Sequence, residues 1–548
     1  MTTLDPADRL DSWKEIASFL RRDVRTVQRW EKKEGLPVHR HHHDKLGSVY
    51  ASRAEVNVWF QGRQQAGASA EAAPACKGDK IKLAVLPFSN LDGQRESDYF
   101  SDGLSEEMIT QLTRLQPEQL TVIAWSTALN YNNTTNSLQQ MRHDLGVDYA
   151  LEGRVRRAGN RVRITARLSE VQDQTQLWAE TYERDVKDLL TVQAEIAKAI
   201  ASEIHLALKL PENERLSRMQ TGQSKVKPNA YDAYLKGRYQ LHKMTPEGIS
   251  TSVADFENAV ELDDSYAPAY AGLASAYALM TIAPFDLVSP LQIMPGAEKA
   301  AKRALQLDNT LPEAHTALAL VEHHYRWNWA AAEKEYKRAI ELNPDYAAAH
   351  LWYSWLLLAL GRREEAFRQI DETMSIVQET DPNRLVAVHA TRAQAYYLGR
   401  QFEQAVQECA KGLQLDAHHF MLHYIMGRSY MRLGDKDKAI AQLEKASSPG
   451  HIPLVDAALG LAYAVTGRLE EARNIGNSFK HLLETRYIPP TYFGMLYAGL
   501  GDRERAIAWL EKAFRERADG LTWLNVDPMM DDMRQDPRFL ELVERIGL

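Results

Sequence analysis

The feature that most constrains the fold is an internal repeat in the second half of the chain. An alanine recurs at successive steps of 35, 34, 39, 34, 33 and 34 residues. A glycine lies five residues before four of these alanines, and three of the units carry Gly-x-x-Tyr ahead of that glycine. The alanines are Ala297, Ala332, Ala366, Ala405, Ala439, Ala472 and Ala506, and the glycines are Gly361, Gly434, Gly467 and Gly501. Small residues let antiparallel helices approach and glycine suits the turn between them, so the period predicts stacked helix pairs.

These positions, together with Pro344 between two units, resemble the tetratricopeptide repeat (TPR) family. An unrelated helical bundle would not keep the spacing over six intervals. The array is expected to span residues 229–548, and the stretch from Asp527 to Phe539, which breaks the period, is expected to cap it. The resemblance implies an all-α solenoid with a concave groove that binds a protein or peptide partner.

The same resemblance implies which side chains face the groove, because fixed positions of the first helix of each TPR line it. Carried onto the repeats that begin near Ala347 and Phe420, the candidate partner-binding residues are Leu351, Trp355, Tyr424, Arg428 and Arg432. The two arginines lie one helical turn apart, a spacing that suits an acidic group of a partner. The alternative is that both arginines pair with acidic residues inside the array.

Two polar segments without apolar periodicity, residues 66–79 and 211–228, are predicted to be linkers. They divide the chain into a head (1–65), a middle domain (80–210) and the repeat array (229–548).

The head shows two short helical patterns in residues 13–34, separated by a turn. The first pattern buries Trp13, Ile16 and Leu20, and Asp23 is placed to cap the second helix. The second helix is expected to bury its apolar face and to present a polar stripe on the other. That stripe consists of Arg25, Gln28, Arg29 and Lys32. Arginine and glutamine can read base edges in the major groove of DNA; the alternative is a solvated helix face.

A wing is predicted after these helices. Residues 38–42 and 48–50 have strand character around a turn, and Ser52 with Glu55 matches a capping box that opens a helix through Phe60. This order, with RTVQRW in the second helix and GLP before the wing, resembles the winged helix-turn-helix of MerR-type regulators and excisionases. The resemblance implies double-stranded DNA as a partner. The candidate DNA contacts are Arg22, Arg25, Thr26, Gln28, Arg29, Lys32, Lys33, Arg40, His43 and Lys45.

Two further features of the head leave alternatives. The histidine-rich run 39–43 is expected to contact phosphate, because no cysteine or paired carboxylate stands nearby to complete a metal site. No long dimerisation helix follows the head, so the sequence leaves the oligomeric state open.

The middle domain alternates strand and helix patterns, which predicts a small α/β sandwich. Strands are expected at residues 82–88, 120–125, 149–156, 161–168 and 177–182, and helices at 101–115, 138–145 and 189–208. The phrases AVLPF, SDGLSEEMITQL and ALEGRVRRAGNRVRITARL resemble the TolB-like N-terminal domain found between DNA-binding heads and TPR arrays in bacterial regulators. Five arginines on one face of the hairpin at 149–168 favour a solvated sheet face; an anion platform is the alternative.

Composition narrows the functional classes. Residues 1–65 carry 12 Lys and Arg against 9 Asp and Glu, a net charge of +3, whereas the rest of the chain carries −11. A basic head on an acidic body is typical of a chain whose one end meets a polyanion. The longest apolar run, near residues 352–360, has nine residues, and a membrane-spanning helix needs about 20. The two cysteines and the start MTTLDPADRL, without a signal peptide, favour the cytoplasm.

The sequence contains no phosphate-binding glycine loop, no nucleophile elbow and no zinc-protease motif, so neither an enzyme nor a cofactor or metal is expected. The overall prediction is a multidomain chain made of a small winged helix-turn-helix, an α/β sandwich domain and an all-α TPR solenoid. Such a chain is expected to be a cytoplasmic, DNA-binding transcriptional regulator whose TPR array binds a protein or peptide. The alternative is an interaction scaffold in signalling, whose winged helix makes contacts with proteins and not with DNA.

Overall fold

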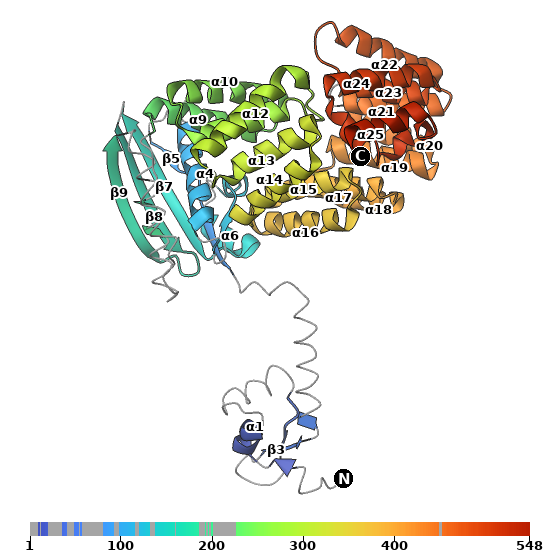
Figure 1. Cartoon of the computed structure of the whole chain (residues 1–548). Helices are drawn as coiled ribbons and strands as arrows, with labels where there is room; N and C mark the ends of the chain where they lie inside the picture. The colour runs from blue at the N-terminus through green and yellow to red at the C-terminus, as the bar shows by residue number, and fades with distance from the viewer. Residues whose placement is uncertain are drawn as a thin grey trace. The chain divides into compact units, whose positions relative to one another are not determined.

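The structure is a computed structural model of the whole chain (Figure 1). It describes residues 80–91, 98–115, 120–131, 137–158, 161–185, 226–448 and 452–548, together with short stretches of residues 9–56 and single positions from 192 to 200. The chain forms two compact units, Met1–Asp79 and Lys80–Leu548, which are described separately.

The first unit contains one described helix and a small antiparallel sheet. The elements are α1 (Trp13–Phe19), β1 (Arg9–Leu10), β2 (His39–Arg40) and β3 (Val49–Ser52), and the strand order is β1-β3-β2. Ile16 of α1 and Val49 of β3 are buried in its apolar core. The first predicted helix and the predicted pairing of the two wing strands are therefore present, and β1 is an additional strand. The second predicted helix lies outside the described residues.

A mixed six-stranded sheet opens the second unit (Figure 1). Its strands are β4 (Ile81–Val85), β5 (Ser89–Asn90), β6 (Leu120–Ile123), β7 (Tyr149–Ala158), β8 (Arg161–Glu170) and β9 (Gln176–Asp185). Their order is β6-β4-β7-β8-β9, with β5 beside β7. β4 is parallel to both neighbours, and β7, β8 and β9 form an antiparallel meander. Each predicted strand of the middle domain is present, but β4 ends at Val85, before the predicted end at residue 88.

Helices cover both faces of this sheet at β4 and β6, whose side chains are buried on both sides. α4 (Asp98–Leu115) packs Leu104 and Met108 on one face, and α6 (Ser137–Leu145) packs Met141 on the other. In the third predicted helix, the described positions Val192 and Ile196 are helical and buried. The prediction that the strand ends at Trp125 is wrong. Trp125 begins a short helix, α5 (Trp125–Leu129), where the chain turns away from the sheet.

Helix pairs follow in the order that the repeat predicts, and residues 226–448 and 452–548 hold eight of them. They are α9 (Pro228–His242) with α10 (Pro246–Leu262), α11 (Ala267–Leu279) with α12 (Pro290–Leu307), α13 (Pro312–Val321) with α14 (Trp329–Leu342), α15 (Ala347–Ala359) with α16 (Arg363–Thr380), α17 (Leu385–Leu398) with α18 (Phe402–Leu415), α19 (Phe420–Leu433) with α20 (Lys436–Ser447), α21 (Pro453–Val465) with α22 (Leu469–Leu482), and α23 (Pro490–Gly499) with α24 (Arg503–Glu516).

The sequence signals have the physical roles expected of them. All seven repeat alanines are fully buried where paired helices cross. Gly434 adopts a φ of 84° at the turn between α19 and α20, a left-handed conformation that favours glycine. At the next position Asp435 accepts a hydrogen bond from the Lys438 N–H and so caps α20. The all-α solenoid is therefore confirmed.

The array departs from this pattern at a few places. A π-helical turn, η4 (Glu322–Arg326), follows α13, and a 3-10 turn, η5 (Pro382–Arg384), precedes α17. Two further 3-10 turns follow α24 before a last helix, in the order η6 (Asp519–Trp523), η7 (Pro528–Met533) and α25 (Pro537–Ile546). Within the described residues, no helix is both long and apolar enough to span a membrane.

The sheet and the first helix pairs share one hydrophobic core. Leu104 and Met108 of α4 belong to the same buried cluster as Tyr234 and Leu235 of α9. The helices approach closely at Gly103, where an added Cβ would lie 2.9 Å from the Cβ of Leu235. The sheet also reaches the middle of the array, because the Ala124 N–H donates to the carbonyl of Thr380 at the end of α16, at 2.7 Å.

Candidate DNA contacts and partner-binding face

The described part of the head places one of the ten candidate DNA contacts. Arg40 lies in β2, paired with Val49 of β3. The other nine, namely Arg22, Arg25, Thr26, Gln28, Arg29, Lys32, Lys33, His43 and Lys45, lie outside the described residues. The Glu55 N–H donates to Ser52 Oγ at 3.3 Å, as in the predicted capping box. Glu55 also engages His39, whose Nε2 lies 2.9 Å from Glu55 Oε2. His39 is therefore paired with a carboxylate of the same unit.

Arg428 lies at the centre of the candidate partner site. Its side chain is 2% exposed and forms an ion pair with the carboxylate of Asp527. The guanidinium also stacks on two rings, 4.2 Å from the centroid of Tyr397 and 4.9 Å from that of Tyr424. Burial alone would lower the pKa of Arg428, but the neighbouring Asp527 carboxylate holds that pKa above its usual value. The Tyr397 hydroxyl donates a hydrogen bond to the same carboxylate at 3.2 Å.

Arg432 lies one turn further along α19 and meets a second acid. Its guanidinium donates to the Asp531 carboxylate at 3.1 Å, and Arg400 donates to that carboxylate at 2.7 Å. Burial raises the pKa of Asp531, but the hydrogen bonds from Arg400 and Arg534 and the charge of Arg432 outweigh it, so the pKa lies below its ordinary value.

Trp355 of α15 contacts the same part of the chain through an aromatic pair. Its ring centroid lies 5.4 Å from that of Trp523 in η6 and 5.6 Å from that of Trp352. Leu351 is half-buried on the same helix. The candidate residues Trp355, Tyr424, Arg428 and Arg432 therefore come from first helices of different repeats and contact, or lie beside, one short stretch of chain.

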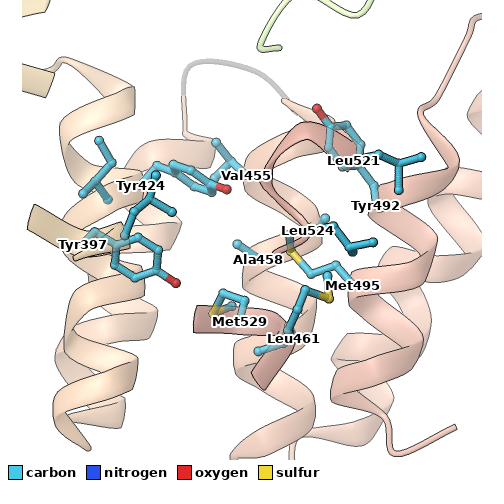
Figure 2. Close-up of a cluster of buried hydrophobic side chains, with 14 of the residues drawn as sticks. Tyr397, Tyr424, Val455, Ala458, Leu461, Tyr492, Met495, Leu521, Leu524 and Met529 are labelled. Carbon is cyan, nitrogen blue, oxygen red and sulfur yellow. The ribbon is translucent and has the colours of Figure 1, made fainter. Parts of the chain in front are cut away.

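We call the surface made by the first helices α15, α17, α19, α21 and α23 the inner face, and residues 518–536 the C-terminal segment. Figure 2 shows how they meet: Leu521, Leu524 and Met529 of the segment lie among apolar side chains of the inner face. The labelled side chains of that face are Tyr397, Tyr424, Val455, Ala458, Leu461, Tyr492 and Met495. The sequence left open whether Arg428 and Arg432 pair with acidic residues of the same chain. In the structure both arginines do so, with Asp527 and Asp531.

Asp519 anchors the other end of the C-terminal segment. Its carboxylate lies 2.5 Å from Nδ1 of His324 in η4 and accepts a hydrogen bond from the Ala283 N–H at 3.2 Å. Nearby, the Tyr492 hydroxyl donates to the carboxylate of Asp286. Burial raises the pKa of Asp286 to about 8; the hydrogen bond from Tyr492 opposes this rise and the charge of Asp519 adds to it. These contacts connect the second and third helix pairs to the end of the array.

A second polar cluster, also absent from the sequence predictions, joins the sheet to the array. Arg238 of α9 forms ion pairs with Glu106 and with Glu107 of α4, the latter at 3.0 Å. Beside it, Arg157 of β7 lies 2.7 Å from the carboxylate of Asp232. All five residues are at least partly buried. Only their partners across the fold distinguish them from ordinary helix charges, so the sequence carries no local signal for this cluster.

The arginine-rich hairpin forms an exposed, paired face. Arg163 lies 3.0 Å and Arg161 lies 3.5 Å from carboxylate oxygens of Glu183 on β9, and Arg167 pairs with Glu152. This is the solvated sheet face that the sequence favours. Among the described residues, no three His, Cys, Asp or Glu side chains are arranged to hold a metal ion.

Comparisons with known families identify two kinds of domain. Residues 79–199 match the family described as HilA/YgeH-like transcriptional regulator, second domain. Residues 328–395, 453–475 and 493–519 match tetratricopeptide repeat families, and residues 373–446 match anaphase-promoting complex, cyclosome, subunit 3. The chain therefore has a HilA-like transcriptional-regulator domain followed by TPR repeats. The winged helix-turn-helix head and the TolB-like assignment of the middle domain are not among these matches.

Whole proteins give partial matches. The chain is 31% identical over 270 residues to putative adenylate cyclase 3 of Rhizobium meliloti. That alignment covers 48% of this chain and 45% of the other protein. It is 23% identical over 318 residues to the transcriptional regulator HilA of Salmonella typhimurium. That alignment covers 57% of this chain and 53% of the HilA protein. The chain thus spans about half the length of the curated relatives it matches.

Solved structures match parts of the chain. A tetratricopeptide repeat protein from Parabacteroides merdae matches with a TM-score of 0.32 and 12% identity, covering 59% of this chain and 100% of that chain. PilF of Pseudomonas aeruginosa matches with a TM-score of 0.31 and 19% identity, covering 41% of this chain and 94% of that chain.

Proposed function

We propose that this protein is a cytoplasmic, DNA-binding transcriptional regulator whose TPR array binds a protein or peptide partner. The observation that carries the proposal is the HilA/YgeH-like regulator domain at residues 79–199, which lies between a basic head and the repeats. The similarity to the regulator HilA over 318 residues supports it.

In this proposal residues 1–65 form a winged helix-turn-helix that binds double-stranded DNA. The paired strands β2 and β3 and the hydrogen bond from Glu55 to Ser52 are consistent with the wing and with the helix after it. The stripe of Arg25, Gln28, Arg29 and Lys32 would enter the major groove, where such side chains read base edges. The middle domain would be TolB-like and connect the head to the array.

The proposed role needs neither a catalytic step nor a cofactor in this chain. The partial match to a putative adenylate cyclase covers 45% of that protein, and the sequence carries none of the catalytic motifs named above. The rival role is an interaction scaffold whose head contacts proteins and not DNA.

A salt titration of DNA binding by the full chain separates these roles. The probe is a fluorescent duplex of about 30 base pairs of random sequence, and fluorescence anisotropy measures its affinity at rising salt concentration. A protein that neutralises phosphates releases counterions, so log K should fall with log[salt] by about 0.9 for each phosphate contacted. On this random duplex we expect Arg25→Ala/Arg29→Ala to weaken binding and to reduce the salt slope by about one for each arginine that contacts a phosphate. On a duplex that carries the specific site, Arg25→Ala or Arg29→Ala alone should weaken binding by about 1–3 kcal/mol if that arginine contacts a base edge.

The matched control is Lys337→Ala/Arg338→Ala, which removes two exposed cations from α14 in the array. The control should bind DNA as the unchanged chain does. Equal affinity of the head variant and the unchanged chain would contradict DNA contact by the second helix. Absence of binding by the unchanged chain at low salt would favour the scaffold.

A further inference from the structure

The C-terminal segment does not behave like part of a repeat. In a solenoid each repeat contacts its sequence neighbours, which gives only short-range contacts. The segment instead contacts residues far away along the chain, because Asp519 meets His324 and Asp527 meets both Tyr397 and Arg428. Its two short 3-10 turns, η6 and η7, also take the place of a regular helix pair.

Closing the end of the array is the task of another element. α25 returns along α24 and pairs with it through Arg538 and Glu504 at 2.8 Å and through Arg545 and Glu511 at 2.8 Å. Its apolar side chains Phe539 and Leu542 are buried. Since α25 covers the last repeat, the segment before it is free to have a different role.

The segment presents the features of a peptide ligand. Asp527 and Asp531 are spaced by four residues, and each carboxylate meets a guanidinium of α19. Trp523 packs edge-to-face against Trp355 as an aromatic anchor. An acidic, aromatic peptide in 3-10 turns is the ligand that the arginines and rings of the inner face fit by charge and shape.

The fit of the segment is incomplete. Three buried polar atoms of the array that lie next to it make no hydrogen bond within the described residues: Nε of Arg428 and Oγ1 of Thr491 on the inner face, and Nε2 of His324 in η4. Thr491 lies against Gly520, where an added Cβ would come within 2.7 Å of that hydroxyl oxygen. Buried donors without partners weaken an interface, so a ligand that satisfies them would bind more tightly.

We propose that the C-terminal segment is an intramolecular ligand that occupies the inner face until an acidic, aromatic segment of a partner protein displaces it. The partner's segment carries two carboxylates spaced by about one helical turn, near an aromatic anchor. The inference rests on the proposed function only in assigning the inner face to a protein partner. Occupation by the chain's own segment is testable without DNA.

The test uses the full chain and a synthetic peptide of residues 518–536 with a fluorophore at its N-terminus. Asp527→Asn/Asp531→Asn in the protein weakens the built-in segment and leaves the inner face unchanged. We expect the labelled peptide to bind this variant at least tenfold more tightly than the unchanged chain, as measured by fluorescence anisotropy. A peptide with the same two asparagines should bind neither protein. The matched control is Glu504→Gln, which breaks an exposed ion pair to α25 and should leave peptide binding as weak as in the unchanged chain.

Hydrogen exchange of the unchanged chain keeps the proposal testable if the double variant fails to fold. A displaceable segment opens without the array, so residues 518–536 should exchange at least tenfold faster than the buried amides of α19 and α21. Exchange of the segment together with those helices would overturn the proposal and make the segment a structural part of the array. Failure of the peptide to bind a folded double variant would overturn it as well. Loss of DNA binding in the separate titration would contradict the proposed function without affecting either result.

Discussion

The TPR array holds two other parts of the chain, and the two contacts differ in kind. The sheet packs on α9 through a continuous apolar core, with buried charges at its margin. The C-terminal segment lies on the inner face through charge pairs and an aromatic pair as well as through buried apolar side chains such as Leu521 and Met529, and several polar atoms beside it make no hydrogen bond within the described residues. A short segment can exchange its contacts for those of another ligand that offers the same charged, aromatic and apolar groups, whereas the sheet is part of a larger folded body and unfolds with the core that it shares.

The difference follows from what each contact would lose on opening. Separating α4 from α9 would expose large apolar side chains such as Leu104 and Leu235 and would leave the charges around Arg238 without their partners. Releasing the segment would expose its buried side chain Leu521 and would separate the buried pair of Asp527 and Arg428. Asp531 and Arg432 are already partly in contact with water. Solvated charges cost little to separate, so substitutions at Asp531 and Arg432 should change stability far less than substitutions around Arg238.

The largest effect is expected at the contact between the sheet and the array. Arg238→Met removes the cation and leaves the carboxylates of Glu106 and Glu107 buried side by side. Breaking one side of a buried ion pair costs about 3–5 kcal/mol, so the free energy of unfolding of the whole second unit should fall by about that amount. Urea unfolding followed by far-UV circular dichroism measures it. Arg338→Met, which removes an exposed pair with Glu341, should change stability by less than about 0.5 kcal/mol.

The same variant should show a characteristic pH dependence. Burial alone raises the pKa of Glu106, but Arg238 and His242 outweigh burial and hold that pKa below its ordinary value. Glu106 thus contributes stability that is present above its ordinary pKa and is lost as the pH falls below it. Without Arg238, burial raises the pKa, so the deficit of the variant should be largest near neutral pH and should shrink towards about pH 5. A deficit that does not change with pH would show that lost packing, and not charge, is responsible.

An intermediate effect is expected where the second helix pair meets the end of the array. The pKa of Asp286 is raised to about 8 from an ordinary value of 3.8. The folded chain therefore keeps a proton that the unfolded chain releases, and stability should fall as the pH rises between these values. The slope is at most about 1.4 kcal/mol per pH unit for one proton.

Asp286→Asn should remove this slope, because asparagine still accepts the hydrogen bond from Tyr492 and does not ionise. Thermal melts between pH 5 and pH 9 compare the variant with the unchanged chain. Asp371→Asn, at an exposed carboxylate on α16, is the control and should leave the slope as it is. An unchanged slope in the Asp286 variant would assign it to other groups.

The contrast between the two contacts also explains what the sequence predicted. The repeat alanines, turn glycines and alternating strands report on neighbours close along the chain, and the predicted solenoid and the strands of the middle domain are present. Contacts across the fold leave no periodic trace. Nothing in the local sequence marks Arg238 as the partner of Glu106. Likewise, nothing near Trp125 shows that the strand ends before this residue and that a short helix begins there.

The inner face was predicted from the sequence only in part. Resemblance to TPRs singled out Trp355, Arg428 and Arg432, and these side chains do lie together near one stretch of chain. The acid that each arginine meets was not predicted individually. The available signal was the break in the period after α24, where Asp527 and Asp531 occur in a stretch that no repeat explains.

The smallest effect on stability is expected at Arg432. This position also tests most directly whether the sheet and the C-terminal segment are held in different ways. Its side chain is 34% exposed and its ion pair with Asp531 is one of several at that carboxylate, so Arg432→Ala should change the free energy of unfolding by less than about 1 kcal/mol. The same substitution removes a contact that holds the segment but none that holds the sheet. Hydrogen exchange should therefore quicken about two- to fivefold in residues 518–536 and stay unchanged in α4 and α9. Arg468→Ala, which breaks an exposed pair with Glu471 away from the inner face, should alter neither region. Faster exchange in both regions would mean that the segment and the sheet belong to one cooperative unit, and the distinction between an exchangeable and a permanent contact would fail.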